Sequence, residues 1–351
     1  MSDSTTIASP GSRQETSLLP GRVVSRIYRS TIVRLIVVRL LQTIPVLFGV
    51  TFILFTLLNV LPGGTAAQIL GTSVTPALLK ALTIKLGLNH PFIIRYFHWL
   101  RLAALHGNLG TSLLNGVPVA TSIGQRLPVS AEIGFVAFVE AMVLAVPVAI
   151  LAARRPRGVL DRMNLIISMF GISCPVFVLA LIASLVFAVH LHWLPAIGYI
   201  PLSGGLWANL RTILLPASSI AFGLFAAFSR ILRADLIDQM NGQDYVITAR
   251  SVGLADWAIL IRYAFRNAVF NLITVAALYI GTIIAGTVLV EQIFGIPGMG
   301  TLLIEAISYR DEPTVLGIVS ILACIVVVAN LLADLLYAAL DPRIRHGNSR
   351  V

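Results

Sequence analysis

Six long apolar runs, separated by short polar segments, constrain this chain more than any other feature of its sequence. A transmembrane α-helix needs roughly 20 residues to cross the hydrocarbon core of a bilayer, and each run reaches or approaches that length. Five of the runs contain no Asp, Glu, Lys or Arg, and the second contains two glutamates. The runs are Leu40–Leu61, Leu127–Ala153, Met163–Leu191, Thr212–Ser229, Asn267–Val290 and Pro313–Ala333.

Composition supports the same reading. Hydrophobic residues make up 57% of the chain and charged residues 11%, whereas soluble domains carry about 25% charged residues. A water-soluble protein of 351 residues has too little interior to hide so much apolar surface. We therefore predict an all-α, polytopic integral membrane protein with six transmembrane helices.

The arginine distribution predicts how these helices are oriented. With the N-terminus in the cytoplasm, 18 of the 25 lysines and arginines fall on the cytoplasmic side and seven on the other. Cytoplasmic loops of membrane proteins carry an excess of Lys and Arg, so both termini are predicted to be cytoplasmic. The net charge of +10 does not indicate a nucleic-acid partner, because the arginines lie between apolar runs rather than on one face.

The predicted spans divide the chain into four parts. Residues 1–34 form a cytoplasmic tail that lacks the apolar region of a signal peptide. Residues 35–126 hold the first transmembrane helix and an extracytoplasmic segment. Residues 127–340 form the transmembrane core, and 341–351 are a cytoplasmic C-terminal tail.

The extracytoplasmic segment, residues 62–126, is called the outer segment below. A helix over 76–85 is predicted from Thr75, a good N-cap residue that precedes a proline at the first helical position. A second helix is predicted over 91–105, closed by Gly107. The outer segment either caps a translocation path and meets a substrate-delivery protein, or lies on the bilayer as a structural apron.

Sequence motifs for catalysis and cofactor binding are missing. The chain has no G-x-x-x-x-G-K-[ST] phosphate loop, no G-x-S-x-G elbow and no H-E-x-x-H motif. The two cysteines fall in different apolar runs, and the six histidines lack metal-ligand spacing. We predict no enzymatic activity, no cofactor and no metal site, so any active transport must draw its energy from a gradient or from a partner.

Two glutamates, Glu132 and Glu140, lie in the second apolar run. A charge near the middle of a span costs about 2.5–3.5 kcal/mol on insertion scales, so such residues face the protein interior and are candidates for function. One interpretation is a proton-coupled pair in a self-sufficient secondary transporter. The other is that each carboxyl hydrogen-bonds a neighbouring helix. No convincing internal repeat, the usual mark of secondary transporters, is present.

A basic, amphipathic segment lies in the cytoplasmic loop 236–266, between the fourth and fifth runs. Ala249 and Gly253 are four residues apart, which predicts a smooth helix face suited to docking into a groove of another protein. Gly253 is expected where the helix ends or where a partner approaches closely. The alternative is a solvated amphipathic loop. The candidate docking residues are Asp244, Tyr245, Thr248, Ala249, Arg250, Gly253 and Leu254.

In order and spacing, several short motifs resemble the dipeptide/oligopeptide/nickel permease family of bacterial ABC importers. The resemblance covers nearly the whole chain after residue 35. The motifs are Pro45-Val46-Leu47-Phe48-Gly49-Val50, Leu86-Gly87-Leu88-Asn89-His90-Pro91, Gly107-Asn108-Leu109-Gly110-Thr111-Ser112, Arg126-Leu127-Pro128, Gly295-Ile296-Pro297-Gly298-Met299-Gly300, and Leu340-Asp341-Pro342-Arg343-Ile344-Arg345.

The resemblance implies a type I ABC-importer permease fold in the bacterial cytoplasmic membrane. It implies a second homologous permease, two ABC ATPase subunits and an extracytoplasmic substrate-binding (lipo)protein as partners, with peptides, a nickel chelate or a related small solute as cargo. In its cytoplasmic docking motif, the small residue and the glycine fall on Ala249 and Gly253. Two positions depart from the pattern: Ile247 stands where the broader superfamily has Glu, and Asn271 where proline is usual.

Overall fold

The computed structural model describes residues 21–60, 66, 70, 75–85 and 87–340, and most of these residues are helical. The helices are α1 (Gly21–Val60), α3 (Pro76–Lys85), α4 (Phe92–His106), α5 (Val119–Arg154), α6 (Val159–Ser173), α7 (Val176–Ala183), the π-helix η2 (Ser184–His190), the 3-10 turn η3 (Leu202–Gly204), α8 (Leu206–Gly242), α9 (Asp244–Ser251), α10 (Asp256–Ile259), the π-helix η4 (Leu260–Ala264), α11 (Phe265–Leu278), α12 (Ile280–Phe294), α13 (Met299–Ser308) and α14 (Glu312–Leu340). The predicted all-α class is confirmed. The C-terminal tail and residues 1–20 of the N-terminal tail lie outside the described residues, and α1 begins within the predicted tail.

Four of the six apolar runs fall in continuous helices that are long and apolar enough to cross a membrane: α1, α5, α8 and α14. A fifth such helix, Asp256–Leu278, comprises α10, η4 and α11. Two further pairs pass the same test but are sharply bent, α6 with α7–η2 and α12 with α13. The described residues thus contain five continuous candidate spans, or up to seven with the bent pairs, and the number six stays a prediction.

The third apolar run, predicted to be one transmembrane helix, is two helices that meet at 106°. Pro175 lacks the backbone N–H that would continue α6, and its ring disfavours helical geometry at the residue before it. Cys174 accordingly has extended backbone angles (φ −84°, ψ 123°). Prolines Pro45, Pro147 and Pro216, by contrast, lie inside continuous helices.

The fifth apolar run is also divided, at Tyr279, between α11 and α12. Tyr279 has ψ −4°, which interrupts the helical ladder, and its ring packs edge-on against Phe228 at 5.4 Å. A left-handed residue, Gly295 (φ 62°), then ends α12, and α13 turns away at 77°.

The centre of the bundle is the contact between α5 and α8. Along α5, alanines recur every fourth residue with no exposed surface: Ala137, Ala141, Ala145 and Ala149. Residues at this spacing share one helix face, and small side chains there let two helices approach closely. On α8 the facing core includes Phe228 and Leu232, both fully buried.

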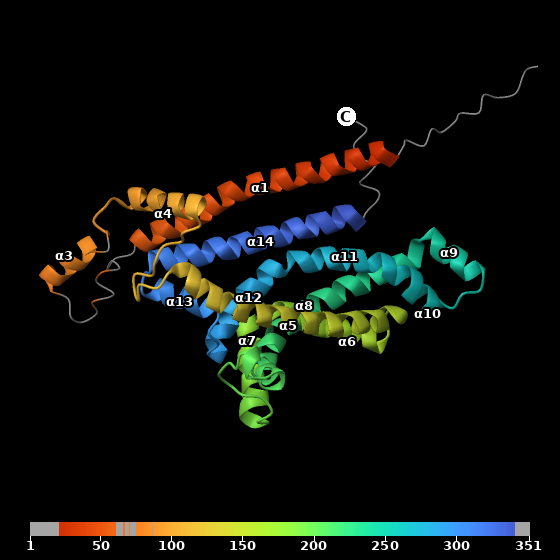
Figure 1. Ribbon diagram of the computed structural model, residues 1–351. Helices are drawn as coiled ribbons and strands as arrows, with labels where there is room; N and C mark the ends of the chain where they lie inside the picture. Colours follow the sequence, from red (N-terminus) through yellow and green to blue (C-terminus); the bar gives the residue numbers. More distant parts are fainter. Residues whose placement is uncertain (1–20, 61–65, 67–69, 71–74, 86, 341–351) are drawn as a thin grey trace, which may run out of the picture.

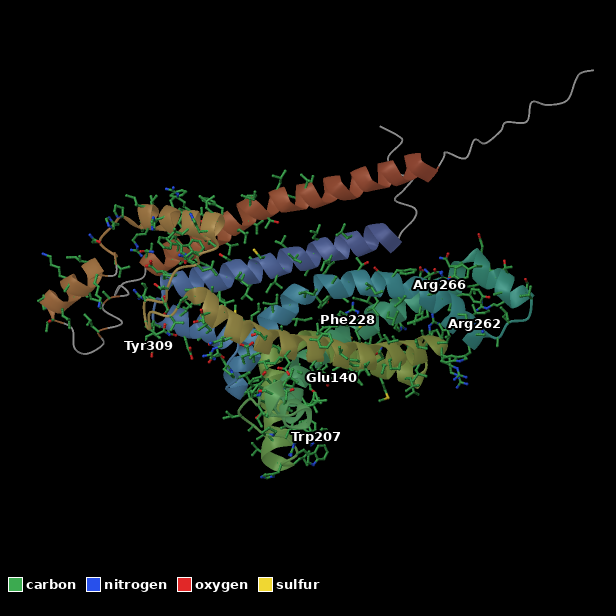
Figure 2. The ribbon with its side chains drawn as sticks, in the orientation of Figure 1. Glu140, Trp207, Phe228, Arg262, Arg266 and Tyr309 are labelled. Carbon is green, nitrogen blue, oxygen red and sulfur yellow. The ribbon has the colours of Figure 1, made fainter. Side chains whose placement is uncertain are left out.

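Around this pair the other elements are arranged in layers (Figure 1). Helices α1 and α14 lie side by side, and α14 also contacts α11. One end of the bundle carries α3, α4 and α13, and the opposite end carries α9 and α10. Figure 2 shows Arg262 and Arg266 at the α9 end and Tyr309 at the other.

The two helices predicted in the outer segment are present as α3 and α4. Gly107 closes α4 in the left-handed conformation (φ 62°), as predicted. Tyr96 on α4 is fully buried against the aromatic side chains of α1. Its hydroxyl lies 2.9 Å from the Thr51 hydroxyl, so α4 is fixed to α1 by both packing and hydrogen bonding.

Candidate functional site

The segment singled out for docking forms the short helix α9, and its end is defined by a glycine. Gly253 has φ +83°, a conformation that costs glycine little and other residues more. Its N–H donates to the Arg250 carbonyl at 3.0 Å, and the Leu254 N–H donates to the Ala249 carbonyl at 3.1 Å. This pair of bonds is a Schellman motif, in which the residue after the helix cap is left-handed. The prediction that Gly253 marks the helix end is confirmed.

One face of α9 is turned toward the rest of the chain. Val246 and Ala249 are buried and form a small core with Ile259, against which Met240 and Tyr245 pack. The expectation that Ala249 lies on the contact face is therefore wrong. The helix has ended before Gly253, so the spacing of four does not place the two small residues on one face, and Ala249 instead shares the inner face with Val246, three residues earlier.

Large apolar side chains of α9, of the turn that follows it and of α10 are exposed. Ile247 is 61% exposed, Val252 71%, Leu254 39% and Trp257 44%. We call these four residues the α9 surface. Asp244, Thr248 and Arg250 are also exposed around it. Several exposed large apolar side chains close together in the sequence, at a bundle end that also carries arginines, are typical of a protein–protein contact. Ile247, where the wider superfamily has Glu, makes this surface more apolar.

Two contacts hold the α9 surface in place: an ion pair between α9 and α10, and a cation–π contact from α5. The Arg250 guanidinium pairs with Asp256 at 2.9 Å, and both side chains are exposed. Arg154, at the end of α5, lies over the Trp257 ring at 5.4 Å. Exposed ion pairs contribute about 0–1 kcal/mol, so the Arg250 guanidinium can exchange its partner at little cost.

Stronger contacts brace the helices behind this surface. Asp161 on α6 is buried and accepts two hydrogen bonds from the Arg233 guanidinium of α8, at 2.6 and 2.7 Å. Asn271 on α11 donates to Asp235 on α8 at 2.7 Å. Because α10 runs through η4 directly into α11, a displacement of α9 and α10 has a rigid route into the bundle.

The two glutamates of α5 are not brought together as a pair. Glu132 accepts a hydrogen bond from the Tyr199 hydroxyl at 2.7 Å, and Glu140 accepts one from the Ser218 hydroxyl of α8 at 2.7 Å. Burial and the Glu132 carboxylate raise the pKa of Tyr199 above its ordinary value, so the phenol stays a donor. Glu140 lies where α5 crosses the centre of the bundle (Figure 2). These separate partners favour the hydrogen-bonding interpretation over a proton-coupled pair.

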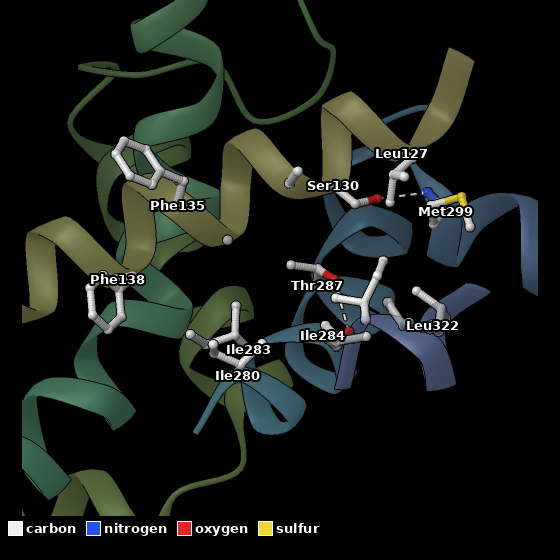
Figure 3. A pocket seen from close by; sticks show the side chains of 14 residues that line it. Leu127, Ser130, Phe135, Phe138, Ile280, Ile283, Ile284, Thr287, Met299 and Leu322 are labelled. Carbon is white, nitrogen blue, oxygen red and sulfur yellow. Dashed lines mark hydrogen bonds between the residues drawn. The ribbon is translucent and has the colours of Figure 1, made fainter. Parts of the chain in front are cut away.

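A cavity of about 310 Å³ lies between α5, α12 and α14. Figure 3 shows Leu127, Ser130 and Met299 toward one end and Phe138 and Ile280 toward the other. Its lining is apolar apart from the hydroxyls of Ser130 and Thr287. No cluster of three or more metal-ligating side chains occurs among the described residues.

Comparison with known proteins identifies the family of this chain. Residues 145–346 match the family described as "Binding-protein-dependent transport system inner membrane component". Residues 32–134 match the N-terminal region of the same kind of membrane component. The chain belongs to this family. It is therefore a permease of the bacterial inner membrane that crosses the bilayer several times.

Curated relatives span almost the same length as this permease. A putative peptide transport system permease of Brucella abortus is 36% identical over 312 residues, which is 89% of this chain and 99% of the relative. The oligopeptide transport system permease AppB of Bacillus subtilis is 34% identical over 314 residues, 89% and 99% of the two chains. The dipeptide transport system permease DppB of Alkalihalophilus pseudofirmus is 32% identical over 328 residues, 88% and 98%. A solved amino acid ABC transporter with histidines aligns with a TM-score of 0.47 at 18% identity, over 64% of the permease and 94% of that chain.

Two buried acidic residues of the permease, Glu291 and Asp311, are not predicted from the sequence, in which both lie between the fifth and sixth apolar runs. Glu291 lies in the last turn of α12 with no exposed surface, and Asp311 directly precedes α14 with 1% of its surface exposed. Asp311 accepts hydrogen bonds from the Ser112 hydroxyl at 2.5 Å and the Leu113 N–H at 3.0 Å, which fixes the outer segment to α14. For Glu291 the signal in the sequence is an acid directly after an apolar run and just before closely spaced glycines.

Proposed function

We propose that this permease is one of two homologous membrane subunits of an ATP-driven importer of peptides. The observation that carries the proposal is the match, over 88–89% of the chain, to relatives named as peptide, dipeptide and oligopeptide permeases. The two subunits together form the translocation path, and two ATPase subunits supply the energy. A chain without a phosphate loop needs such partners.

Energy enters through the α9 surface. In this proposal α9 lies on the cytoplasmic side and inserts into a cleft of an ATPase subunit, with Ile247, Val252 and Leu254 as its apolar contacts. Their exposure of 61%, 71% and 39% supports this role, because apolar side chains at an interface gain free energy on leaving water. The Arg250 guanidinium exchanges Asp256 for a carboxylate of the partner.

Movement then passes into the membrane along two routes. The first runs from α10 through η4 into α11, and the second uses the Val246–Ala249–Ile259 core, which packs on Met240 at the end of α8. The close packing of this core supports a rigid transfer of movement, because closely packed side chains transmit a displacement rather than absorb it.

Substrate arrives from the opposite side. An extracytoplasmic binding protein releases peptide at the end of the bundle that carries α3, α4 and α13. Support comes from the fixed position of α4, whose Tyr96 is buried against α1, and of the Ser112 region, which Asp311 ties to α14. These anchors make α4 and the Ser112 region a stable platform for a partner.

Affinity purification of the full chain from its native membrane tests the proposal. An ATPase subunit and a second permease are expected to copurify with the wild-type chain. Ile247→Asp, which puts a charge on the α9 surface, is expected to lose the ATPase and keep the second permease. The matched control is Ile197→Asp, a similarly exposed residue (72%) between α7 and α8. A chain that purifies without any ATPase, yet is intact in the membrane, contradicts the proposal.

A further inference from the structure

A buried carboxylate organises the junction of three helices at the α13 end of the cavity. Glu291 has no exposed surface. One of its oxygens accepts a hydrogen bond from the Ser130 hydroxyl of α5 at 2.6 Å. The other accepts the backbone N–H groups of Gly300 and Thr301, at 2.7 and 3.2 Å. The side chain of α12 therefore caps α13, whose own N-cap residue, Gly298, supplies no side-chain cap.

Ser130 closes this network. Its oxygen also accepts the N–H of Met299, at 2.7 Å, so one hydroxyl of α5 joins the carboxylate of α12 to the first residue of α13. In this network, the Ser130 hydroxyl makes every hydrogen bond between α5 and the corner formed by α12 and α13. The bonds within the corner come from the Glu291 carboxylate itself.

Two glycines make this approach possible. A Cβ atom at Gly298 would overlap the Glu291 carboxylate, and one at Gly300 would overlap both the carboxylate and the Val288 backbone. The close approach of the Glu291 carboxylate therefore explains why residues 298 and 300 are both glycine.

The junction borders the cavity. Ser130 and Met299 both line it, together with Thr287 of α12, and Figure 3 shows the Ser130–Met299 bond at one end. The other end of α13 is held as well, because the Asp311 N–H donates to the Ala306 carbonyl at 2.8 Å and Asp311 binds the outer segment. Helix α13 is thus fastened at both ends beside the cavity.

We propose that Glu291 is a positioning residue that latches α13 over this end of the cavity, with the Ser130 hydroxyl as the part that releases. The α12–α13 corner moves as one unit, because Glu291 keeps its bonds to Gly300 and Thr301. Within the Glu291 network, opening the cavity toward the α13 side breaks only the bonds to Ser130, and the bond from Asp311 to Ala306 at the other end of α13 stays in place. The proposal rests on the proposed function, in which this cavity is part of a gated path.

Cysteine accessibility tests the latch without measuring transport. Cys174 and Cys324 are replaced by alanine in the full chain, and Thr287→Cys supplies a probe inside the cavity at a buried position. A membrane-impermeant maleimide is added to the assembled complex from the α13 side. Ser130→Ala and Glu291→Gln are expected to raise the labelling rate about tenfold or more, because tenfold corresponds to the lower end of what one hydrogen bond to a charged group contributes.

The chain offers a matched control. Ser218 and Glu140 form another hydroxyl–carboxylate bond, between α8 and α5, at a similar distance of 2.7 Å but away from α13. Ser218→Ala and Glu140→Gln are expected to leave labelling at Thr287→Cys unchanged. Ser130→Thr keeps the hydroxyl and is expected to restore the low rate.

The outcomes separate the latch from the proposed function. Unchanged labelling in Ser130→Ala, in protein of normal abundance and melting temperature, refutes the latch, and so does an equal rise in the Ser218→Ala control. Glu291→Gln serves as the second variant if Ser130→Ala fails to fold. A tenfold rise in labelling without any ATPase in the complex keeps the latch and contradicts the importer.

Discussion

Replacing Gly253 tests whether ATPase binding requires the left-handed end of α9. Gly253 has φ +83°, and no atom lies within 4 Å of the position that a Cβ would take, so a side chain there fits in space but strains the backbone. For a β-branched residue this conformation is a marked outlier, and left-handed geometry costs a non-glycine residue about 1–2 kcal/mol. Gly253→Val is therefore expected to disfavour the Schellman end of α9 by that amount, while Gly253→Asn, which tolerates the conformation, costs less.

The expected strain energy at residue 253 can be measured as a loss of binding affinity. If α9 must be fully formed to bind the ATPase, about 1–2 kcal/mol weakens association by a factor of about 5–30. Titration of purified ATPase onto the full chain in nanodiscs measures this directly. We expect Gly253→Val to bind about 5–30 times more weakly, Gly253→Asn to bind nearly as wild type, and both to insert normally. Equal affinity of Gly253→Val and wild type would refute the link between the left-handed end and docking.

Further predictions concern the rest of the chain. Single cysteines are placed at Asn108 and Gly242, which are both exposed. The cysteine at 108 is expected to label from outside the cell, and the cysteine at 242 only after permeabilisation. Labelling at 242 in intact cells would overturn the predicted orientation. Asp161→Asn removes the charge and one of the two hydrogen bonds from the Arg233 guanidinium, because the amide keeps only one acceptor oxygen. A hydrogen bond to a charged group is worth about 1.5–3 kcal/mol, so the substitution is expected to lower the melting temperature in detergent clearly. A shift no larger than that of Arg250→Ala, which breaks an exposed pair, would speak against a brace. Tyr199→Phe and Ser218→Ala are expected to leave uptake independent of the proton gradient, and a collapse of uptake on adding a protonophore at constant ATP would revive the proton-coupled pair.

Most of the helices and the broad class can be predicted from the sequence alone. Long apolar runs with at most two charged residues form helices in a bilayer, which is why α1, α5, α8 and α14 lie where the runs predict them. Local signals also predict α3 and α4, because caps and glycine stops act within a few residues. The breaks at Pro175 and Tyr279 are harder to predict. A proline in an apolar run bends or ends a helix depending on what packs beside it, and Tyr279 owes its position to the Phe228 ring from another helix.

The candidate site divides in the same way. The left-handed end at Gly253 is predictable, since glycine preference is local. The burial of Ala249 is not, because it depends on Ile259, which the chain brings back from beyond the turn. The sequence pattern places Glu291 in a loop because its partners, Ser130 and the α13 backbone, do not show in the hydropathy of the run that it follows. Hydropathy cannot show that a carboxylate at the end of a run turns inward.

The central claim is that this chain carries peptides only as part of an ATP-driven complex. Uptake of a labelled peptide into proteoliposomes measures it most directly, with the chain reconstituted either alone or together with its second permease, ATPases and binding protein. We expect the complete complex to accumulate peptide when ATP is supplied and the chain alone to accumulate none, with or without a proton gradient. Gradient-driven uptake by the chain alone, without ATP, would contradict the account.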